Sequence, residues 1–216
     1  MTGGPYDPRA IANLMLDEAD RSGIKVTNLA LQKLLYFAHS IFLIEAKRPL
    51  VSGYFEAWQY GPVHPAAYSA FKTAGSSPID FRATGQNVMT GERTVLDLPE
   101  DLTVRRHLAR IMSSYGQLSP ERLVDISHAK GAPWDYIADK GRTSVALGLR
   151  IPDDVIVNRF KFHNVSIGAA PVAGEPDEDT PLAPLPTDQK RRALEHFKLG
   201  HPTITYKPVR ARFLSG

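Results

Sequence analysis

The residues from 28 to 46 are apolar on almost every side of a helix, and this feature limits the fold more than any other. Thr27 is suited to cap such a helix, and the apolar residues that surround its axis are Leu31, Leu34, Leu35, Phe37, Ala38, Ile41, Phe42 and Ile44. A helix of this kind is usually the buried centre of a domain. Its narrow polar edge, Gln32, Tyr36, His39 and Ser40, is expected to meet another element. The apolar run is too short and too polar to predict a membrane span.

Periodic apolar residues and capping residues predict further helices around this centre. They are expected from Asp7 to Gly23, from His64 through Phe71, over 101–115, from Ser119 to Gly131, as a short turn at 133–134, and from 151 onward. The aromatic segment 50–60 predicts a strand, and 75–99 predicts short strands or an irregular excursion. The expected fold is mainly α (α+β): a compact helical domain around a buried central helix, with a small β element and a C-terminal extension.

The end of the chain differs in composition from the rest. Residues 1–164 are expected to form the helical domain, whereas residues 165–186 hold five prolines and four acidic residues and predict a linker. Residues 187–216 predict a basic tail: a short helix, then an alternating segment, 203–214, with the composition for strand addition. Partner-binding residues are predicted there, namely Leu194, Phe197, Tyr206, Arg210, Arg212 and Phe213. The pattern leaves open whether the tail docks on its own domain or on a partner.

Residue patterns that would indicate catalysis are missing. The chain has no cysteine, which excludes disulfides, thiolate catalysis and Cys-ligated zinc and fits a reducing cytoplasm. It has no phosphate-cradling glycine loop and no hydrolase or metalloprotease motif. We therefore predict no enzyme and no catalytic, cofactor-binding or metal-ligating residue. His39 and His128 could act as general bases, but a hydrogen-bonded core histidine and a helix-end histidine are the commoner roles.

A DNA-binding function is the alternative that the charges raise. Arg105, Arg106 and Arg110 place positive charge along one face of a predicted helix, and the helices before and after Gly116 could mimic a helix-turn-helix. The second of these helices carries acidic residues, Glu121 and Asp125, where a reading helix needs Arg, Asn or Gln. The net charge of +3 permits an acidic partner without requiring nucleic acid.

Three sequence blocks resemble the Panacea antitoxin family, in its GepA-like and SocA-like branches. They are LQKLLYFAHSIFL at 31–43, YFEAWQYGPVHPAAYSAF at 54–71 and LVDISHAKGAPWDYI at 123–137. The resemblance covers about residues 7–160 and implies a mainly helical domain with no catalytic residues or cofactor. Within it, the motif residues Trp58, Tyr60, Gly61, Pro62 and Trp134 are interpreted as structural, with Gly61-Pro62 expected to form a sharp turn from strand to helix.

The same resemblance implies what the protein does. It implies an antitoxin of a type II-like toxin–antitoxin system, which neutralises a cognate toxin by direct contact. In the SocA-like branch it further implies a proteolytic adaptor that delivers the toxin to the ClpXP protease. The excursion at 75–99 and the chain after Asn164 lie outside the common pattern, so specificity is expected there. Regulation of its own operon by DNA binding stays the alternative.

Overall fold

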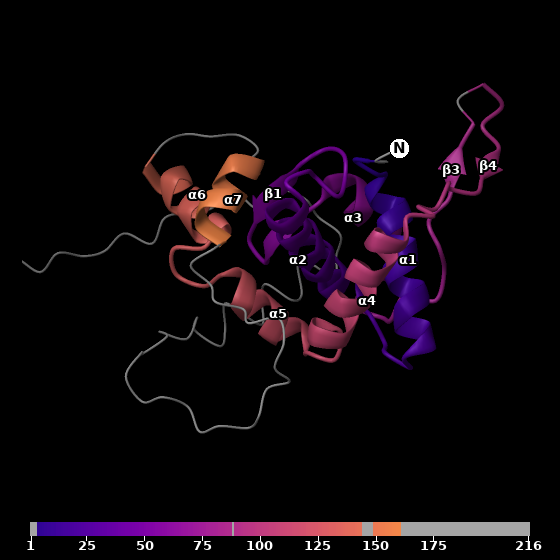
Figure 1. Ribbon diagram of the computed structural model, residues 1–216, viewed down its shortest axis with the longest axis horizontal. Coiled ribbons are helices and arrows are strands. Elements are labelled where there is room, and N and C mark those ends of the chain that lie inside the picture. Colours follow the sequence, from indigo (N-terminus) through magenta and orange to yellow (C-terminus); the bar gives the residue numbers. More distant parts are fainter. Residues whose placement is uncertain (1–3, 88, 144–148, 161–216) are drawn as a thin grey trace, which may run out of the picture.

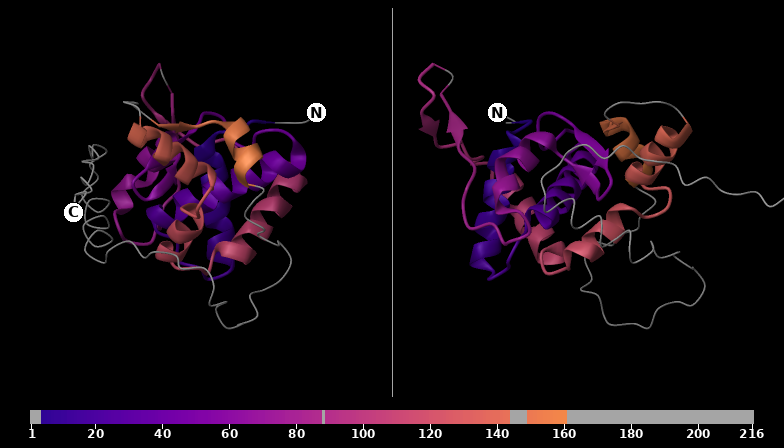
Figure 2. Two further views of the ribbon diagram at one scale, coloured as in Figure 1. Left: turned by 90° about the vertical axis from the view of Figure 1, so that its left-hand side faces the viewer. Right: turned by 180° about the vertical axis from the view of Figure 1, so that it is seen from behind.

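The computed structural model describes residues 4–87, 89–143 and 149–160, with helices gathered around one central helix (Figures 1 and 2). The helices are α1 Pro8–Arg21, α2 Asn28–Ala46, α3 Pro65–Phe71, the 3-10 helix η1 Lys72–Ala74, α4 Leu102–Tyr115, α5 Pro120–Ser127, α6 Pro133–Thr143 and α7 Asp153–Arg159. The strands are β1 Phe55–Trp58, β2 Gly61–Val63, β3 Gly85–Gln86, β4 Arg93–Thr94 and β5 Arg150–Ile151. The predicted class, mainly helical with a small β element, is confirmed.

Helix α2 is the centre of the domain, as its composition predicted. Its residues from Asn28 to Leu43 are all buried, and α1, α3, α4, α5, α7 and β2 pack around it. Each fully buried leucine or phenylalanine there stabilises the fold by about 1.5–3 kcal/mol. The sequence predicted this run to be too short and too polar to span a membrane, yet α2 is long and apolar enough to do so by length and composition alone. In the structure 83% of its most apolar stretch is buried inside the domain.

The small sheet corrects one expectation about the motif YGPV. Gly61 and Pro62 do not turn the chain from a strand into a helix, because they belong to β2, which pairs antiparallel with β1. The turn lies at residues 59 and 60, and Gly61 faces Trp58 in the ladder. Strand β5 pairs with the other edge of β1, which gives the order β2-β1-β5. A glycine and a proline fit this short edge strand because β2 needs few ladder hydrogen bonds.

Two helix lengths also differ from expectation. Helix α5 ends at Ser127, before the predicted stop at Gly131. Helix α6, expected to be a short turn, runs for 11 residues. Its length follows from packing that local sequence does not display, since Ile137 is buried in the core and Trp134 packs against it.

A two-stranded hairpin projects from the helical body on the side away from α6 and α7 (Figures 1 and 2). Strands β3 and β4 pair antiparallel, Gly85 opposite Thr94 and Gln86 opposite Arg93. We call residues 85–87 and 89–98, which include this hairpin and the segment that returns to α4, the arm. The short strands expected in the 75–99 excursion are thus present.

The predicted linker 165–186 and tail 187–216 lie outside the described residues. So do the six residues predicted to bind a partner, Leu194, Phe197, Tyr206, Arg210, Arg212 and Phe213. Those predictions remain sequence predictions.

Candidate partner-binding surface

The three sequence blocks meet at one buried point below β2. Lys33, from the first block, is fully buried, and its Nζ donates a hydrogen bond to the Pro62 carbonyl at 2.8 Å. Burial lowers the pKa of Lys33 far below its usual value because the charged form loses its hydration. Gly61 lies beside it with φ +94°, and a Cβ there would be 2.5 Å from Ser127 Oγ. The motif glycine is therefore required both by its backbone angle and by close packing.

The aromatic motif residues close the same cluster from the side. Trp134 donates its indole N–H to the Trp58 carbonyl at 2.8 Å, which ties α6 to β1. Its ring stacks on His128, with centroids 3.6 Å apart. Burial raises the pKa of Tyr60 to about 12. All five residues interpreted as structural, Trp58, Tyr60, Gly61, Pro62 and Trp134, lie within this one region of the fold, on β1, β2, the turn between them and α6.

His39 is held between backbone and carboxylate. Its Nδ1 accepts a hydrogen bond from the Val51 amide at 3.4 Å, and its Nε2 lies 3.2 Å from Asp153 Oδ1. The ring is 3% exposed. These contacts give His39 the hydrogen-bonded core position that the sequence analysis weighed against catalysis.

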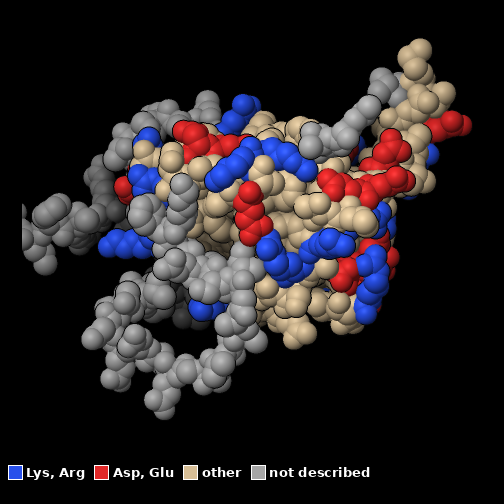
Figure 3. Space-filling view, viewed as in Figure 1, with Lys and Arg blue, Asp and Glu red and all other residues tan. Residues whose placement is uncertain are grey.

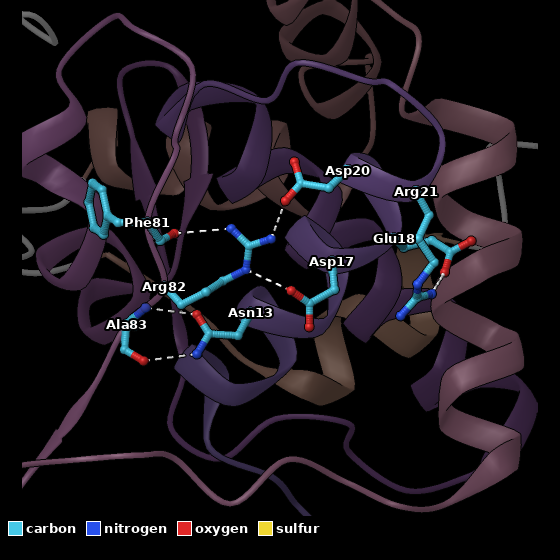
Figure 4. Close-up of polar contacts among 8 residues, drawn as sticks. All are labelled: Asn13, Asp17, Glu18, Asp20, Arg21, Phe81, Arg82 and Ala83. Atoms are coloured by element: carbon cyan, nitrogen blue, oxygen red, sulfur yellow. Dashed lines mark hydrogen bonds and ion pairs between the residues drawn. The ribbon is translucent and has the colours of Figure 1, made fainter.

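The base of the arm is fastened to α1 by two side chains (Figure 4). Asn13 donates to the Ala83 carbonyl at 2.9 Å and accepts from the Ala83 amide at 2.8 Å, as a neighbouring strand would. Arg82 donates to Asp17 at 2.7 Å and also pairs with Asp20. The arm thus starts from a fixed point on the helical body.

Substituting Asn13 with alanine tests this attachment. Asn13 is 5% exposed, so the variant leaves the Ala83 amide and carbonyl without their partner. We expect the free energy of unfolding to fall by about 2 kcal/mol, as measured by urea denaturation. The control is Asn158→Ala, an exposed position on α7, where a change within about 0.5 kcal/mol is expected. Equal effects of the two variants would contradict the proposed attachment.

The arm carries the most exposed apolar side chains of the described residues. Met89 is 92% exposed and Val95 is 90% exposed, and Leu102, at the start of α4 next to the arm, is 65% exposed. Apolar side chains as exposed as these are uncommon on a protein surface, and several of them along one element are a candidate interaction surface. The same segment turns acidic where it rejoins α4, with Asp97, Glu100 and Asp101, and Figure 3 shows acidic side chains gathered there.

A groove of about 890 Å³ lies at the base of the arm. Its lining includes Arg9, Arg82 and Arg93 and the small residues Ala66 and Ala70 of α3. Two of these arginines are neutralised: Arg9 pairs with Asp7 at 2.7 Å and Arg82 with Asp17. Because two of the three arginines are compensated, the groove has only a weak preference for an acidic ligand over a neutral one.

Comparison with known proteins gives the class of this helical domain with its projecting arm. The family "Antitoxin SocA-like, Panacea domain" matches residues 31–135. The chain belongs to the SocA-like, Panacea-domain antitoxin family, proteins of toxin–antitoxin systems, as the three sequence blocks indicated.

A particular relative supports the same assignment. The chain is 45% identical over 175 residues to Antitoxin SocA of Caulobacter vibrioides (strain NA1000 / CB15N), an alignment that covers 81% of this chain and 93% of that protein. No solved structure matches the chain significantly.

A second family matches the end of the chain. Residues 180–215 are similar to the family "Sliding clamp-binding bacterial toxin SocB". This stretch contains all six tail residues that were predicted to bind a partner. A chain of the antitoxin family thus carries toxin-like sequence at its C-terminal end.

Sequence reasoning missed the residues of the arm. Met89 and Val95 were not singled out, because an isolated apolar residue in a loop gives no periodic signal. The only sequence indication was the composition of 75–99, which departs from the family pattern. Lys33 was also missed, since a lysine within an apolar run usually points to solvent.

Proposed function

We propose that the chain acts as an antitoxin by holding its toxin in direct contact, with the arm as the contact surface. The observation that carries this proposal is the exposure of Met89 and Val95 on an arm whose base is fixed by Asn13 and Arg82. Because the base of the arm is already fixed, covering its apolar side chains costs less conformational freedom than covering those of an unattached loop, and this favours binding. The arm also lies in the part of the chain where specificity was expected.

Coexpression tests the proposal in cells. The toxin encoded beside this protein is expressed with and without the chain, and growth is recorded while the tagged chain is recovered. We expect restored growth and recovery of toxin with the chain. Restored growth with no toxin bound would oppose direct contact.

A substitution in the arm is expected to weaken toxin binding. Val95→Asp places a charge where the toxin is expected to cover an apolar side chain, so we expect affinity for the toxin to fall about 30-fold. The matched control is Tyr54→Ser, because Tyr54 is an exposed apolar residue outside the arm, and it should leave affinity unchanged. Equal losses in both variants, measured by surface plasmon resonance, would exclude the arm as the contact surface.

We further propose that the chain delivers the toxin to the ClpXP protease. An adaptor must hold substrate and protease together, and the predicted tail, residues 187–216, would supply the second contact at high local concentration. The chain would then work in the cytoplasm, which its lack of cysteine fits. Toxin half-life measured with and without ClpX tests this step: an unchanged half-life would leave masking as the mechanism.

We propose no catalytic role for the histidines. His39 is occupied by Val51 and Asp153, and His128 stacks on Trp134. Conservative His39→Asn and His128→Asn variants that fold are expected to neutralise toxin as well as the wild type does. Loss of neutralisation with toxin binding intact would speak for chemistry at one of them.

DNA binding receives little support from the helical surface. Arg110 pairs with Glu45, and Arg105 donates to the Pro99 carbonyl at 3.1 Å, so two of the three arginines are engaged within the domain. A gel shift on the promoter at low salt is the corresponding test.

The toxin-like end raises a second candidate function, contact with the sliding clamp. The matching family is described as sliding clamp-binding, and residues 180–215 would supply that contact here. Binding of purified clamp to the full chain, lost when Phe197 and Phe213 are changed to serine, is the expected result.

A further inference from the structure

The returning segment of the arm has an open backbone edge. Exposure alternates along it: Val95 and Asp97 are exposed, and Leu96 and Leu98 pack partly against the core. This is the two-residue period of an extended chain. Among the described residues, no backbone hydrogen bond engages the amides and carbonyls of Leu96, Asp97 and Leu98. Such an edge can accept another strand.

The charge of this edge favours a basic strand. From Glu92 to Asp101 the chain has four carboxylates and one arginine. No ion pair engages Asp97 or Glu100 among the described residues. Opposite charges across neighbouring strands attract, and like charges repel.

The chain contains a segment that meets these requirements. Residues 203–214, TITYKPVRARFL, alternate in character and carry Lys207, Arg210 and Arg212 with no acidic residue. They lie within the stretch that is similar to the toxin family. A domain of the antitoxin family and a toxin-like segment therefore occur in one molecule.

The connection is long enough to join the two sites. Helix α7 and the arm lie at opposite ends of the domain (Figure 1). Between Arg159 and Thr203 there are more than forty residues. Even with the short helix expected at the start of the tail, the remaining thirty or so residues span about 100 Å when fully extended and about 30 Å on average as a flexible coil. A domain of this size is about 40 Å across, so residues 203–214 can reach the arm of their own chain.

We propose that residues 203–214 add as a strand to the edge formed by residues 95–98 of the same molecule, so that the toxin-like tail occupies the surface that the toxin uses. That the toxin uses this same surface rests on the proposed function, whereas the docking of the tail does not. Backbone hydrogen bonds supply the attraction in such strand addition, and Arg210 and Arg212 beside Asp97 and Glu100 fix position and direction. The toxin must then displace the tail to bind.

Paired cysteines test this docking in the full-length chain, which has no cysteine of its own. Asp97→Cys is combined in turn with Arg210→Cys, Ala211→Cys and Arg212→Cys, and each double variant is oxidised at high dilution. A strand presents alternate residues on one face, so disulfide yield at 210 or 212 should exceed that at 211 by about fivefold. Mass spectrometry after proteolysis identifies the bridge.

The matched control moves the first cysteine to the other end of the domain. Asp154 is an exposed acidic residue on α7, and Asp154→Cys with Arg212→Cys should give little intramolecular bridge. Equal yields from positions 97 and 154, or bridges formed only between two molecules, would overturn the proposal. Equal yields at 210, 211 and 212 would overturn strand addition.

Charge reversal gives a second, independent measurement. Asp97→Lys with Glu100→Lys should reduce the disulfide yield between cysteines at 95 and 214, which share the faces of 97 and 212, about tenfold, and Arg210→Glu with Arg212→Glu in the same chain should restore it. A reduction that the second pair does not reverse would overturn the charge pairing.

Adding toxin separates the two claims. If the tail docks and toxin also binds, toxin should lower the bridge yield. A chain that forms the bridge on oxidation but binds no toxin when it is reduced would contradict the proposed function and leave the docking intact. Toxin binding without a bridge would contradict only the docking.

Discussion

Replacing Gly61 with alanine is expected to lower the free energy of unfolding by about 3 kcal/mol. Two costs add: the positive φ of +94° disfavours any side chain by about 1–2 kcal/mol, and crowding in a filled interior costs a further 1–3 kcal/mol or so. The new methyl group would lie 2.5 Å from Ser127 Oγ and 3.0 Å from Lys33 Cε. The site joins α2, β2 and α5, so the change should weaken the whole domain.

Gly23→Ala separates the two costs. Gly23 also has a positive φ, +66°, but no atom lies within 4 Å of the position of its Cβ. Only the backbone cost applies, so a loss of about 1 kcal/mol is expected. Urea denaturation of both variants gives the comparison. Equal losses would show that crowding at Gly61 contributes nothing.

The second large effect is a dependence of stability on pH that comes from Lys33. Its folded pKa is lowered by burial, so between that pKa and its ordinary value near 10.5 the unfolded chain binds more protons than the folded one. The free energy of unfolding must then rise with pH, by up to about 1.4 kcal/mol per pH unit. The stability that depends on neutral Lys33 is fully present above the unfolded pKa, and it is lost as the pH falls through the folded pKa.

Lys33→Met keeps the volume and removes the titrating group. Between pH 7 and pH 9 we expect the free energy of unfolding of this variant to rise less steeply than that of the wild type, by up to about 1.4 kcal/mol per pH unit. This expectation concerns the slope and does not depend on the variant's stability at pH 7. Lys25→Met, at an exposed position, serves as the control and should keep the wild-type slope. The slopes come from urea denaturation at each pH. A wild-type slope in the Lys33 variant would mean that Lys33 keeps its proton in the folded state.

The sequence predicted elements whose causes are local. Helix α2 was predictable because Thr27 caps it and apolar residues surround its axis. Strand β2 was not, because pairing of Gly61 with Trp58 depends on tertiary packing below the sheet. The family blocks predicted which residues meet around Gly61 without predicting that Lys33 lies among them.

The candidate surface was predictable only in part. The excursion 75–99 stood out by composition, and it contains most of the arm. Its attachment through Asn13 joins residues 70 positions apart, which no local pattern records. The exposure of Met89 and Val95 follows from that attachment and from the shape of the hairpin.

Isothermal titration calorimetry of the purified full chain with its purified toxin tests direct contact, the central claim, most directly. We predict a saturable complex, weakened by Val95→Asp and unchanged by Tyr54→Ser. If the titration gives no heat of binding although the same chain restores growth of cells that make the toxin, direct contact is contradicted.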